Sequence, residues 1–171
     1  MRIITTAFML TCFIACQAPK NDLASSLEAF KTNAESIKKM MQNYVDETPD
    51  YSVYDSTFVF YPTNFYTKNP ISIALKEYRV RDKFILDIYD FEIVDALNPI
   101  PGFDAETQKI DNSVNVNVTW KITKSATDST KRRSAMMPIH HAYYFNEEGK
   151  IVKYESFGNF TGLFQYLDVK E

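Results

Sequence analysis

The chain has 171 residues, of which 45% are hydrophobic and 15% aromatic, and its formal net charge is −3. This length is typical of one domain, and the aromatic content favours a fold rich in β-sheet. The mild negative charge offers no basic stripe for nucleic acid, and only 4 glycines argue against a glycine-built phosphate loop. We therefore predict no nucleic-acid partner and no cofactor.

The N-terminal segment has the pattern of an export signal. Arg2 supplies a short positive region, and residues 3–14 form an apolar stretch. That stretch is too short to span a bilayer, which needs about 20 apolar residues. Residues 13–16 read Phe-Ile-Ala-Cys, which resembles the bacterial lipobox with Phe in place of the usual Leu. The alternatives are an ordinary signal peptide that is cut elsewhere and a buried N-terminal helix.

The lipobox resemblance implies a protein that is anchored to a membrane by lipid. We predict that residues 1–15 are a signal peptide, that Cys16 carries the lipid, and that residues 16–24 form a tether. Gln17 follows the cysteine, and the lack of Asp there resembles lipoproteins that are sorted onward to an outer membrane of the cell envelope. The only other cysteine, Cys12, lies in the removed segment, which excludes a disulfide and a cysteine zinc site in the exported domain.

The domain itself is expected to cover residues 25–171 and to begin with a helix over residues 25–46. Ser25 and Glu28 have the spacing of a capping box at the start of this helix. One apolar stripe runs along it at intervals of three and four residues. Its members are Leu27, Phe30, Ala34, Ile37, Met41 and Tyr44. The stripe is shorter than three heptads, so it favours a helix packed on its own domain over a coiled coil.

Strands dominate the rest of the chain. They are expected over residues 57–61, 84–94, 114–123, 134–145 and 150–157. The third of them is the clearest, because apolar and polar residues alternate strictly along it, so one of its faces should be buried. The apolar residues are Val114, Val116, Val118, Trp120 and Ile122.

The connecting segments have patterns of their own. A short second helix is expected to begin at Asn69-Pro70 and to include Tyr78. Residues 97–112 are rich in proline and read as a loop. Residues 146–149 read Asn-Glu-Glu-Gly, which predicts a tight hairpin turn whose glycine takes a positive φ.

The C-terminal hairpin has a pattern that is seen in a known superfamily. Residues 143–152 read Tyr-Tyr-Phe-Asn-Glu-Glu-Gly-Lys-Ile-Val, and residues 153–163 continue as a strand that runs into a helical turn near residues 161–167. These segments resemble the nuclear transport factor 2-like, or SnoaL-like, superfamily. Together with the order of the elements, the likeness covers residues 25–167. It implies an α+β fold, with a cone-shaped, curved antiparallel sheet packed against N-terminal helices in a cystatin-like arrangement around an apolar pocket.

That superfamily includes polyketide cyclases, ketosteroid isomerases and epoxide hydrolases, but other members bind ligands or only dimerise. The enzymes need a carboxylate in the pocket, where burial raises its basicity. Asn159 stands where the family often has an acid, and Tyr61 and Trp120 stand at strand positions that the isomerases fill with acids. Tyr44 resembles the hydrogen-bonding tyrosine late in the first helix of those isomerases. The resemblance therefore argues against an isomerase.

We predict a ligand site inside the cone. Its candidate residues are Tyr44, Tyr61, Trp120, His141, Tyr143 and Asn159. Tyr51, Tyr54 and Tyr66 add rings near the first strand, which could stack on a ring-shaped ligand, although ordinary packing is the preferred interpretation.

His141 and Asp90 are the candidates for catalysis. His141 lies on the apolar side of its strand and could face the pocket, although a hydrogen-bonded core histidine is the preferred interpretation. Asp90 could pair with Glu92 in the pocket, but a solvated strand end is preferred. His140 and His141 face opposite sides of one strand, so we predict no metal site.

The residues leave three functions open. The preferred hypothesis is a lipid-anchored envelope protein that binds a small apolar or aromatic ligand without catalysis. The second is an interaction protein that forms a homodimer through the outer face of the sheet. The third is an enzyme of the SnoaL-like kind that acts through His141 or Asp90.

Overall fold

The computed structural model of the chain describes residues 22–63, 71–127 and 131–169. In chain order its elements are α1 (Asp22–Val45), the 3-10 turn η1 (Tyr51–Val53), β1 (Tyr54–Pro62), β2 (Ile73–Ala74), α2 (Leu75–Leu86), β3 (Tyr89–Ile93), β4 (Ile100–Phe103), β5 (Ile110–Lys124), β6 (Arg133–Phe145), β7 (Ile151–Phe157) and α3 (Phe160–Leu167). The predicted signal peptide, Cys16, Tyr66, Asn69 and Pro70 lie outside the described residues. The second helix was predicted to begin at Asn69-Pro70, but this is wrong, because Ile73–Ala74 is a strand and α2 begins at Leu75.

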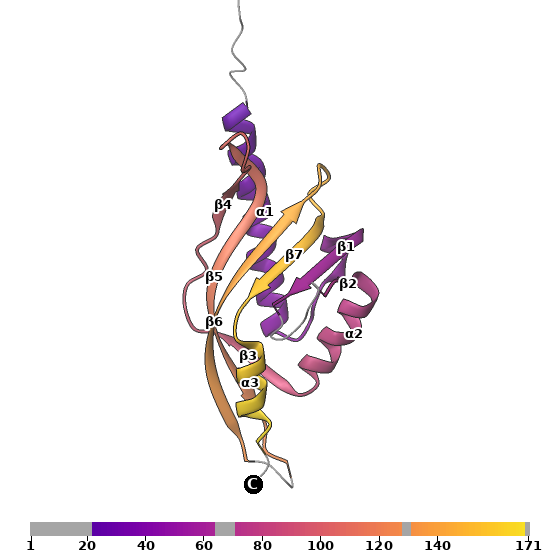
Figure 1. Cartoon of the computed structure of the whole chain (residues 1–171), viewed down its shortest axis with the longest axis vertical. Helices are drawn as coiled ribbons and strands as arrows, with labels where there is room; N and C mark the ends of the chain where they lie inside the picture. Colours follow the sequence, from indigo (N-terminus) through magenta and orange to yellow (C-terminus); the bar gives the residue numbers. More distant parts are fainter. Residues whose placement is uncertain (1–21, 64–70, 128–130, 170–171) are drawn as a thin grey trace, which may run out of the picture.

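The strands form one curved sheet, which Figure 1 shows with its long strands side by side. The strand order is β2-β1-β7-β6-β5-β3, and β4 pairs with the beginning of β5. The β1–β7 pair is parallel, whereas the other five pairs are antiparallel. The predicted α+β fold with a curved sheet is therefore confirmed, but the prediction of a wholly antiparallel sheet is wrong. The last strand returns beside the first in the same direction, and no local sequence pattern reveals such a pairing.

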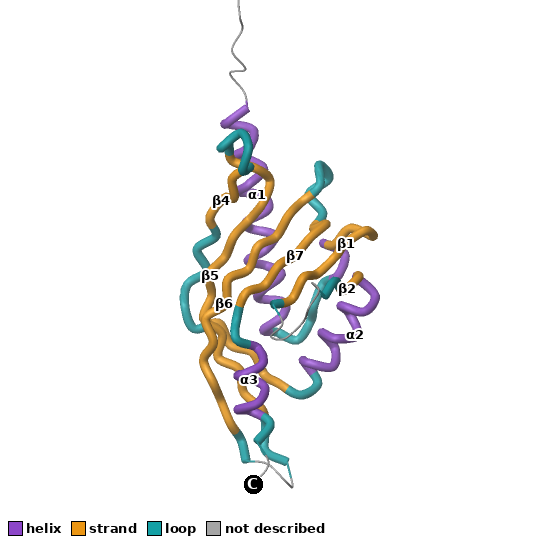
Figure 2. The backbone as a smooth tube through the Cα atoms, viewed as in Figure 1, coloured by secondary structure: helices purple, strands orange, loops and turns teal. Residues whose placement is uncertain are grey.

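The helices cover the face of the sheet that carries the buried residues. Helix α1 runs behind the sheet and packs against β5 and β3, α2 packs against β1, and α3 packs against β6 (Figure 2). On α1, Ile37 and Met41 are buried as their place in the apolar stripe predicts. The predicted inward residues of β5, from Val114 to Ile122, are all buried as well. This face of the sheet and α1 together form the core.

Helix α1 begins earlier than predicted. Its first residue is Asp22, so Ser25 lies inside the helix rather than at its cap, and the predicted capping box with Glu28 at the helix start is wrong. Helix ends are the least certain part of a prediction from residue pattern. The Glu28 side chain is instead 3.5 Å from the Lys31 ammonium on the exposed surface.

The strand predicted over residues 84–94 is half wrong. Its first residues, Phe84 to Leu86, form the last turn of α2, and only Tyr89–Ile93 is a strand. The run of apolar residues suggested a strand, but Phe84 is 64% exposed because it points away from the core on the outer side of the helix. The loop predicted over residues 97–112 likewise contains β4 and the first residues of β5.

The predicted hairpin turn between β6 and β7 is confirmed. Gly149 has a φ of +71°, which a residue without a Cβ adopts at little cost. The Asn146 side chain accepts hydrogen bonds from the backbone N–H groups of Glu148 and Lys150, at 3.0 and 2.9 Å. The turn thus sets the register in which β6 and β7 pair.

Gly102, in β4, gives a first stability prediction. A Cβ built on it would overlap the Ser113 Oγ and lie 2.8 Å from the Asp111 Oδ1. We expect Gly102→Ala to lower the free energy of unfolding by about 1–3 kcal/mol, because overpacking of a filled site forces shifts. Gly158→Ala is the control, since its Cβ would come no closer than 3.3 Å to Ile139 and 3.5 Å to Phe160. Urea unfolding of the two variants tests this, and an equal loss in both would contradict it.

Candidate functional site

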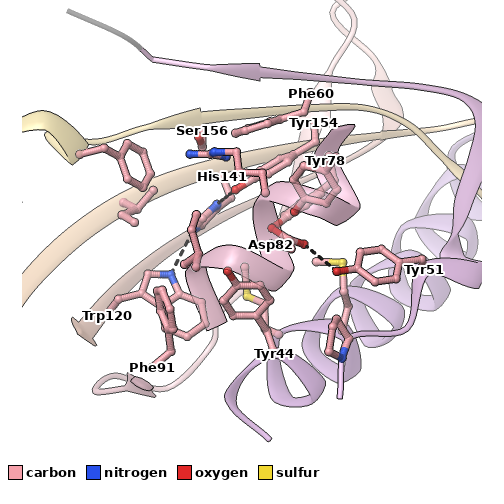
Figure 3. Close-up of a pocket in the computed structure, with 18 of the residues that line it drawn as sticks. Tyr44, Tyr51, Phe60, Tyr78, Asp82, Phe91, Trp120, His141, Tyr154 and Ser156 are labelled. Carbon is pink, nitrogen blue, oxygen red and sulfur yellow. Dashed lines mark hydrogen bonds between the residues drawn. The ribbon is translucent and has the colours of Figure 1, made fainter. Parts of the chain in front are cut away.

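An apolar cavity lies between the sheet and the helices, and Figure 3 shows it in close-up. Every layer of the fold contributes to its wall. Helix α1 contributes Tyr44, α2 contributes Tyr78 and Asp82, and the sheet contributes His141 and Tyr154. Aromatic and aliphatic side chains make up most of the wall, so a molecule inside would be largely removed from water.

The cavity is small for a binding site. Its volume is about 100 Å³, whereas an engineered protein cavity that binds benzene has about 150 Å³. A one-ring ligand therefore fits only when side chains of the wall move. Met40 and Met41 of α1 form part of that wall, and unbranched thioether side chains rearrange easily.

The register of the sheet stacks three rings in the cavity wall. Phe60 on β1 pairs with Tyr154 on β7, which in turn pairs with Tyr143 on β6. The Tyr154 ring lies 4.6 Å from each of the other two ring centroids, with interplanar angles of 15° and 6°. Tyr154 is therefore held between two rings, and its hydroxyl has a fixed position.

Three further rings meet on the opposite side of the cavity. Tyr44 of α1 contacts Phe91 edge-on at 5.0 Å and Trp120 at 6.2 Å, and Phe91 and Trp120 lie 5.8 Å apart. Edge-to-face pairs of this kind are favourable beyond the area that they bury. Burial raises the pKa of Tyr44 well above its ordinary value, so its hydroxyl stays protonated.

His141 is buried and makes two hydrogen bonds in the cavity wall. The Trp120 indole N–H donates to its Nε2 at 3.2 Å, and its Nδ1 lies 2.6 Å from the Tyr154 hydroxyl oxygen. Burial, with a smaller contribution from the neighbouring His140, lowers the pKa of His141 to about 3. Both ring nitrogens are engaged and the ring is neutral, which favours a structural role over that of a base.

Asp82 is a buried carboxylate in the cavity wall that the sequence analysis missed. It is only 4% exposed, and burial raises its pKa to about 7, against the opposing effects of Arg81, Tyr51 and Tyr78. The signal that could have found it is its spacing. Tyr78, Asp82 and Ile85 recur at intervals of four and three, so they share the inward face of α2.

Asp82 has no ion-pair partner among the residues that the structure describes. The Tyr51 hydroxyl donates to its Oδ2 at a long distance of 3.4 Å. The neighbouring Arg81 guanidinium instead lies over the Phe60 ring, 5.1 Å from its centroid. A buried carboxylate without a cation is costly, and natural chains retain such groups mainly where they serve a function.

The predicted ligand residues divide into two groups. The cavity wall contains four of them: Tyr44, Trp120, His141 and Tyr143. Tyr61 lies outside it, because it follows the inward-facing Phe60 and its ring lies near the Lys153 ammonium instead. Asn159 also lies outside, since its side chain caps α3 by accepting a hydrogen bond from the Gly162 N–H at 3.0 Å. Tyr51 and Tyr54, whose packing was the preferred interpretation, do line the cavity.

Asp90 lies away from the cavity, contrary to the hypothesis that it acts there. It alternates along β3 with Phe91, whose ring faces inward, so Asp90 and Glu92 are exposed on the other face. Glu92 accepts a hydrogen bond from the Lys121 ammonium on that face. Both carboxylates are therefore exposed to solvent, in agreement with the preferred interpretation that they form a solvated strand end.

The described residues offer neither a metal site nor a membrane-spanning helix. Within residues 22–63, 71–127 and 131–169, no group of three or more His, Cys, Asp or Glu side chains is arranged to hold a metal ion. Over the same residues, no helix has both the length and the apolar character needed to cross a membrane.

Solved structures share this architecture. A nuclear transport factor 2-like protein of unknown function from Burkholderia pseudomallei matches with a TM-score of 0.53 and 10% identity, covering 84% of this chain and 98% of that one. The chain has a nuclear transport factor 2-like fold. A phenazine biosynthesis-related protein from Pseudomonas aeruginosa matches this fold with a TM-score of 0.61 and 14% identity, over 85% of this chain and 91% of that one.

An enzyme shares the same nuclear transport factor 2-like fold. The BvnE pinacolase from Penicillium brevicompactum matches with a TM-score of 0.57 and 14% identity, covering 88% of this chain and 94% of that one. No protein-family model and no curated protein matches the sequence. At such low identities the likeness establishes the fold, and the function has to be argued from the cavity.

Proposed function

We propose that the protein is a lipid-anchored protein of the cell envelope whose cone binds a small, ring-shaped apolar ligand. The observation that carries the proposal is the aromatic cavity that encloses one carboxylate, Asp82, with no ion-pair partner among the described residues. A cavity that served packing alone would be filled by apolar side chains. The aromatic walls supply affinity for a ring, and Asp82 supplies a polar contact that orients it.

The single tryptophan of the chain is a built-in reporter for this proposal. Trp120 lines the cavity, so a ligand there should change its fluorescence. We expect one-ring apolar compounds to change the emission in a saturable way, and Tyr44→Ala to weaken their binding. Tyr61→Ala is the matched control, because Tyr61 faces away from the cavity. No saturable change across a panel of one-ring compounds would contradict the proposed function.

Anchoring at Cys16 is a separate part of the proposal and has its own test. We expect the wild-type protein to sediment with membranes and to be released by detergent, because more than one acyl chain gives stable attachment. Cys16→Ser should abolish lipid attachment and leave the chain unprocessed at residue 15. Cell fractionation with mass measurement of the mature N-terminus checks this. A lipid-free wild-type N-terminus would contradict the anchor.

Acid–base catalysis by Asp82 is the second candidate function. Its specific support is the pKa of about 7, since an effective general base titrates near the working pH. The expected activity is proton abstraction next to a carbonyl group of a bound ring compound. Deuterium exchange from solvent into enolisable aryl ketones, followed by NMR, tests it. Exchange that persists unchanged in Asp82→Asn would exclude this candidate.

We also propose that the protein forms a homodimer through the outer face of the sheet. Met136 and Phe157 expose large apolar side chains on the outer face of the sheet, where Phe157 lies beside His140. Exposed apolar surface of this kind marks contact sites when it is contiguous. Light scattering of the purified protein tests the proposal, and a strict monomer at high concentration would contradict it.

A further inference from the structure

Three side chains form a hydrogen-bonded chain in the cavity wall (Figure 3). Trp120 on β5, His141 on β6 and Tyr154 on β7 are linked by contacts of 3.2 and 2.6 Å. All three are at least nine-tenths buried and line the cavity. They come from three neighbouring strands of one sheet, so their relative positions are set by the strand register.

The chemistry of Trp120 fixes the direction of this chain. An indole N–H can only donate, so the His141 Nε2 must carry a lone pair. Since the imidazole is neutral, its one proton sits on Nδ1 and is donated to the Tyr154 oxygen. An imidazolium would instead turn two N–H groups toward each other at Trp120, which is a further reason why this ring stays neutral.

The Tyr154 hydroxyl therefore has its own proton left to donate. The hydroxyl groups of Tyr143 and Ser156 are its hydrogen-bonding neighbours, beside the His141 ring. The Ser156 hydroxyl lies beside it on the same strand, is fully buried and makes no hydrogen bond of normal geometry in that part of the chain. Tyr143, Tyr154 and Ser156 thus form a group of neutral hydroxyls into which His141 donates, and no described residue outside the group accepts from it. When these hydroxyls donate to one another in a chain, the last one still has a proton to donate into the cavity.

We propose that Tyr154, assisted by Ser156, donates a hydrogen bond to a carbonyl oxygen of the ligand, and that Trp120 and His141 are the positioning residues that orient this donor. The proposal rests on the proposed ligand-binding function and names the chemical class of the ligand as a ring-bearing carbonyl compound. Unpaired buried donors are costly, so the site favours an acceptor over an apolar group of the same shape.

The charges around the cavity favour a neutral carbonyl group over a carboxylate. The donors at this end of the site are uncharged hydroxyls, and burial raises the pKa of Tyr154, which keeps it protonated. The cavity wall also contains the buried acid Asp82, whose ionised form would repel an anion in the same cavity. Two neutral donors with an acid nearby suit a ketone, an aldehyde or an amide carbonyl.

A matched pair of probes tests the proposal on the purified full chain. Acetophenone and α-methylstyrene have nearly the same shape. Acetophenone has a carbonyl oxygen at the position where α-methylstyrene has a =CH₂ group. Dissociation constants from Trp120 fluorescence give a preference ratio for the ketone in each variant. We expect Tyr154→Phe to reduce that ratio by up to about tenfold, the worth of one neutral hydrogen bond. Uptake of the probes by lipid or detergent cancels when ratios are compared between variants.

Tyr61→Phe is the control for this substitution. Tyr61 lies outside the cavity wall, where its ring is near the Lys153 ammonium, so the loss of its hydroxyl should leave the ketone preference unchanged. If both probes bind and Tyr154→Phe keeps the wild-type ratio, the carbonyl inference is wrong and the ligand-binding function stands. Binding of neither probe overturns the proposed function for one-ring ligands and this inference with it.

Nitrogen-15 NMR tests the positioning role without any ligand. The chain has 2 histidines, so the two rings are readily assigned. We expect the His141 signals to show a protonated Nδ1 and an unprotonated Nε2, and Trp120→Phe to shift the ring toward a tautomer mixture. A protonated Nε2 in the wild-type protein would break the Trp120–His141 hydrogen bond and make the Tyr154 hydroxyl donate to Nδ1, which would overturn the proposal.

Discussion

Replacing Asp82 with asparagine should make the folded protein progressively more stable than wild type as the pH rises, by about 4 kcal/mol between pH 4 and pH 8. Burial raises the pKa of Asp82 from its ordinary value of 3.8 to about 7. The folded chain therefore holds this proton over a pH range in which the unfolded chain has lost it. The contribution of the Asp82 proton to the free energy of unfolding is fully present below pH 3.8 and is lost as the pH rises to 7.

The asparagine side chain of the Asp82→Asn variant resembles the protonated acid in shape and never ionises, so the substitution removes this loss. Other titrating groups contribute equally to both proteins and cancel in the difference. Urea unfolding at pH 4, 5, 6, 7 and 8, followed by circular dichroism, measures it. A difference between the two proteins that stays constant over this range would show that the Asp82 carboxyl titrates as an ordinary exposed acid.

Replacing His141 with glutamine should have the opposite pH dependence. Burial lowers the pKa of His141 from 6.5 to about 3, so the unfolded chain binds a proton that the folded chain excludes. The stability contribution of His141 is present above pH 6.5 and is lost as the pH falls toward 3. Wild type should therefore lose about 3 kcal/mol relative to His141→Gln between pH 7 and pH 4.

The two effects oppose each other between pH 4 and pH 6.5. Wild-type stability should consequently depend only weakly on pH in this window, because the change due to Asp82 offsets the change due to His141. Each single variant should show a slope of opposite sign, and the double variant should again be flat. Parallel pH profiles for the two single variants would mean that one of these side chains is not buried in its neutral form.

Local patterns in the sequence predicted much of the fold. The stripe of α1 and the alternation of β5 each report directly which residues face the core, and both are borne out by the burial of Ile37 and Val116. The hairpin glycine was predicted because a positive φ is a local requirement. The parallel β1–β7 pair was not, because it joins segments that lie far apart in the sequence and share no local pattern.

The cavity was harder to predict than the fold. Alternation shows that Asp90 and Phe91 point to opposite faces, but only the packed structure shows that Phe91 faces inward. Asp82 was missed because it lies on a helix with several other charged residues, and a charged side chain in such a helix is ordinarily expected to be exposed to solvent. The burial that raises its pKa is completed by residues of other elements, such as Tyr44 of α1 and Tyr154 of β7, so it exists only after folding.

We expect the cone to hold a small ring-bearing molecule against Trp120 and Tyr154. Native mass spectrometry of the protein purified from the cells that make it tests this most directly. We expect an added mass of one small molecule, released on denaturation, whose fragments contain a ring and a carbonyl group. An empty cone in the wild-type protein, with no saturable change in Trp120 fluorescence for any one-ring compound, would contradict it.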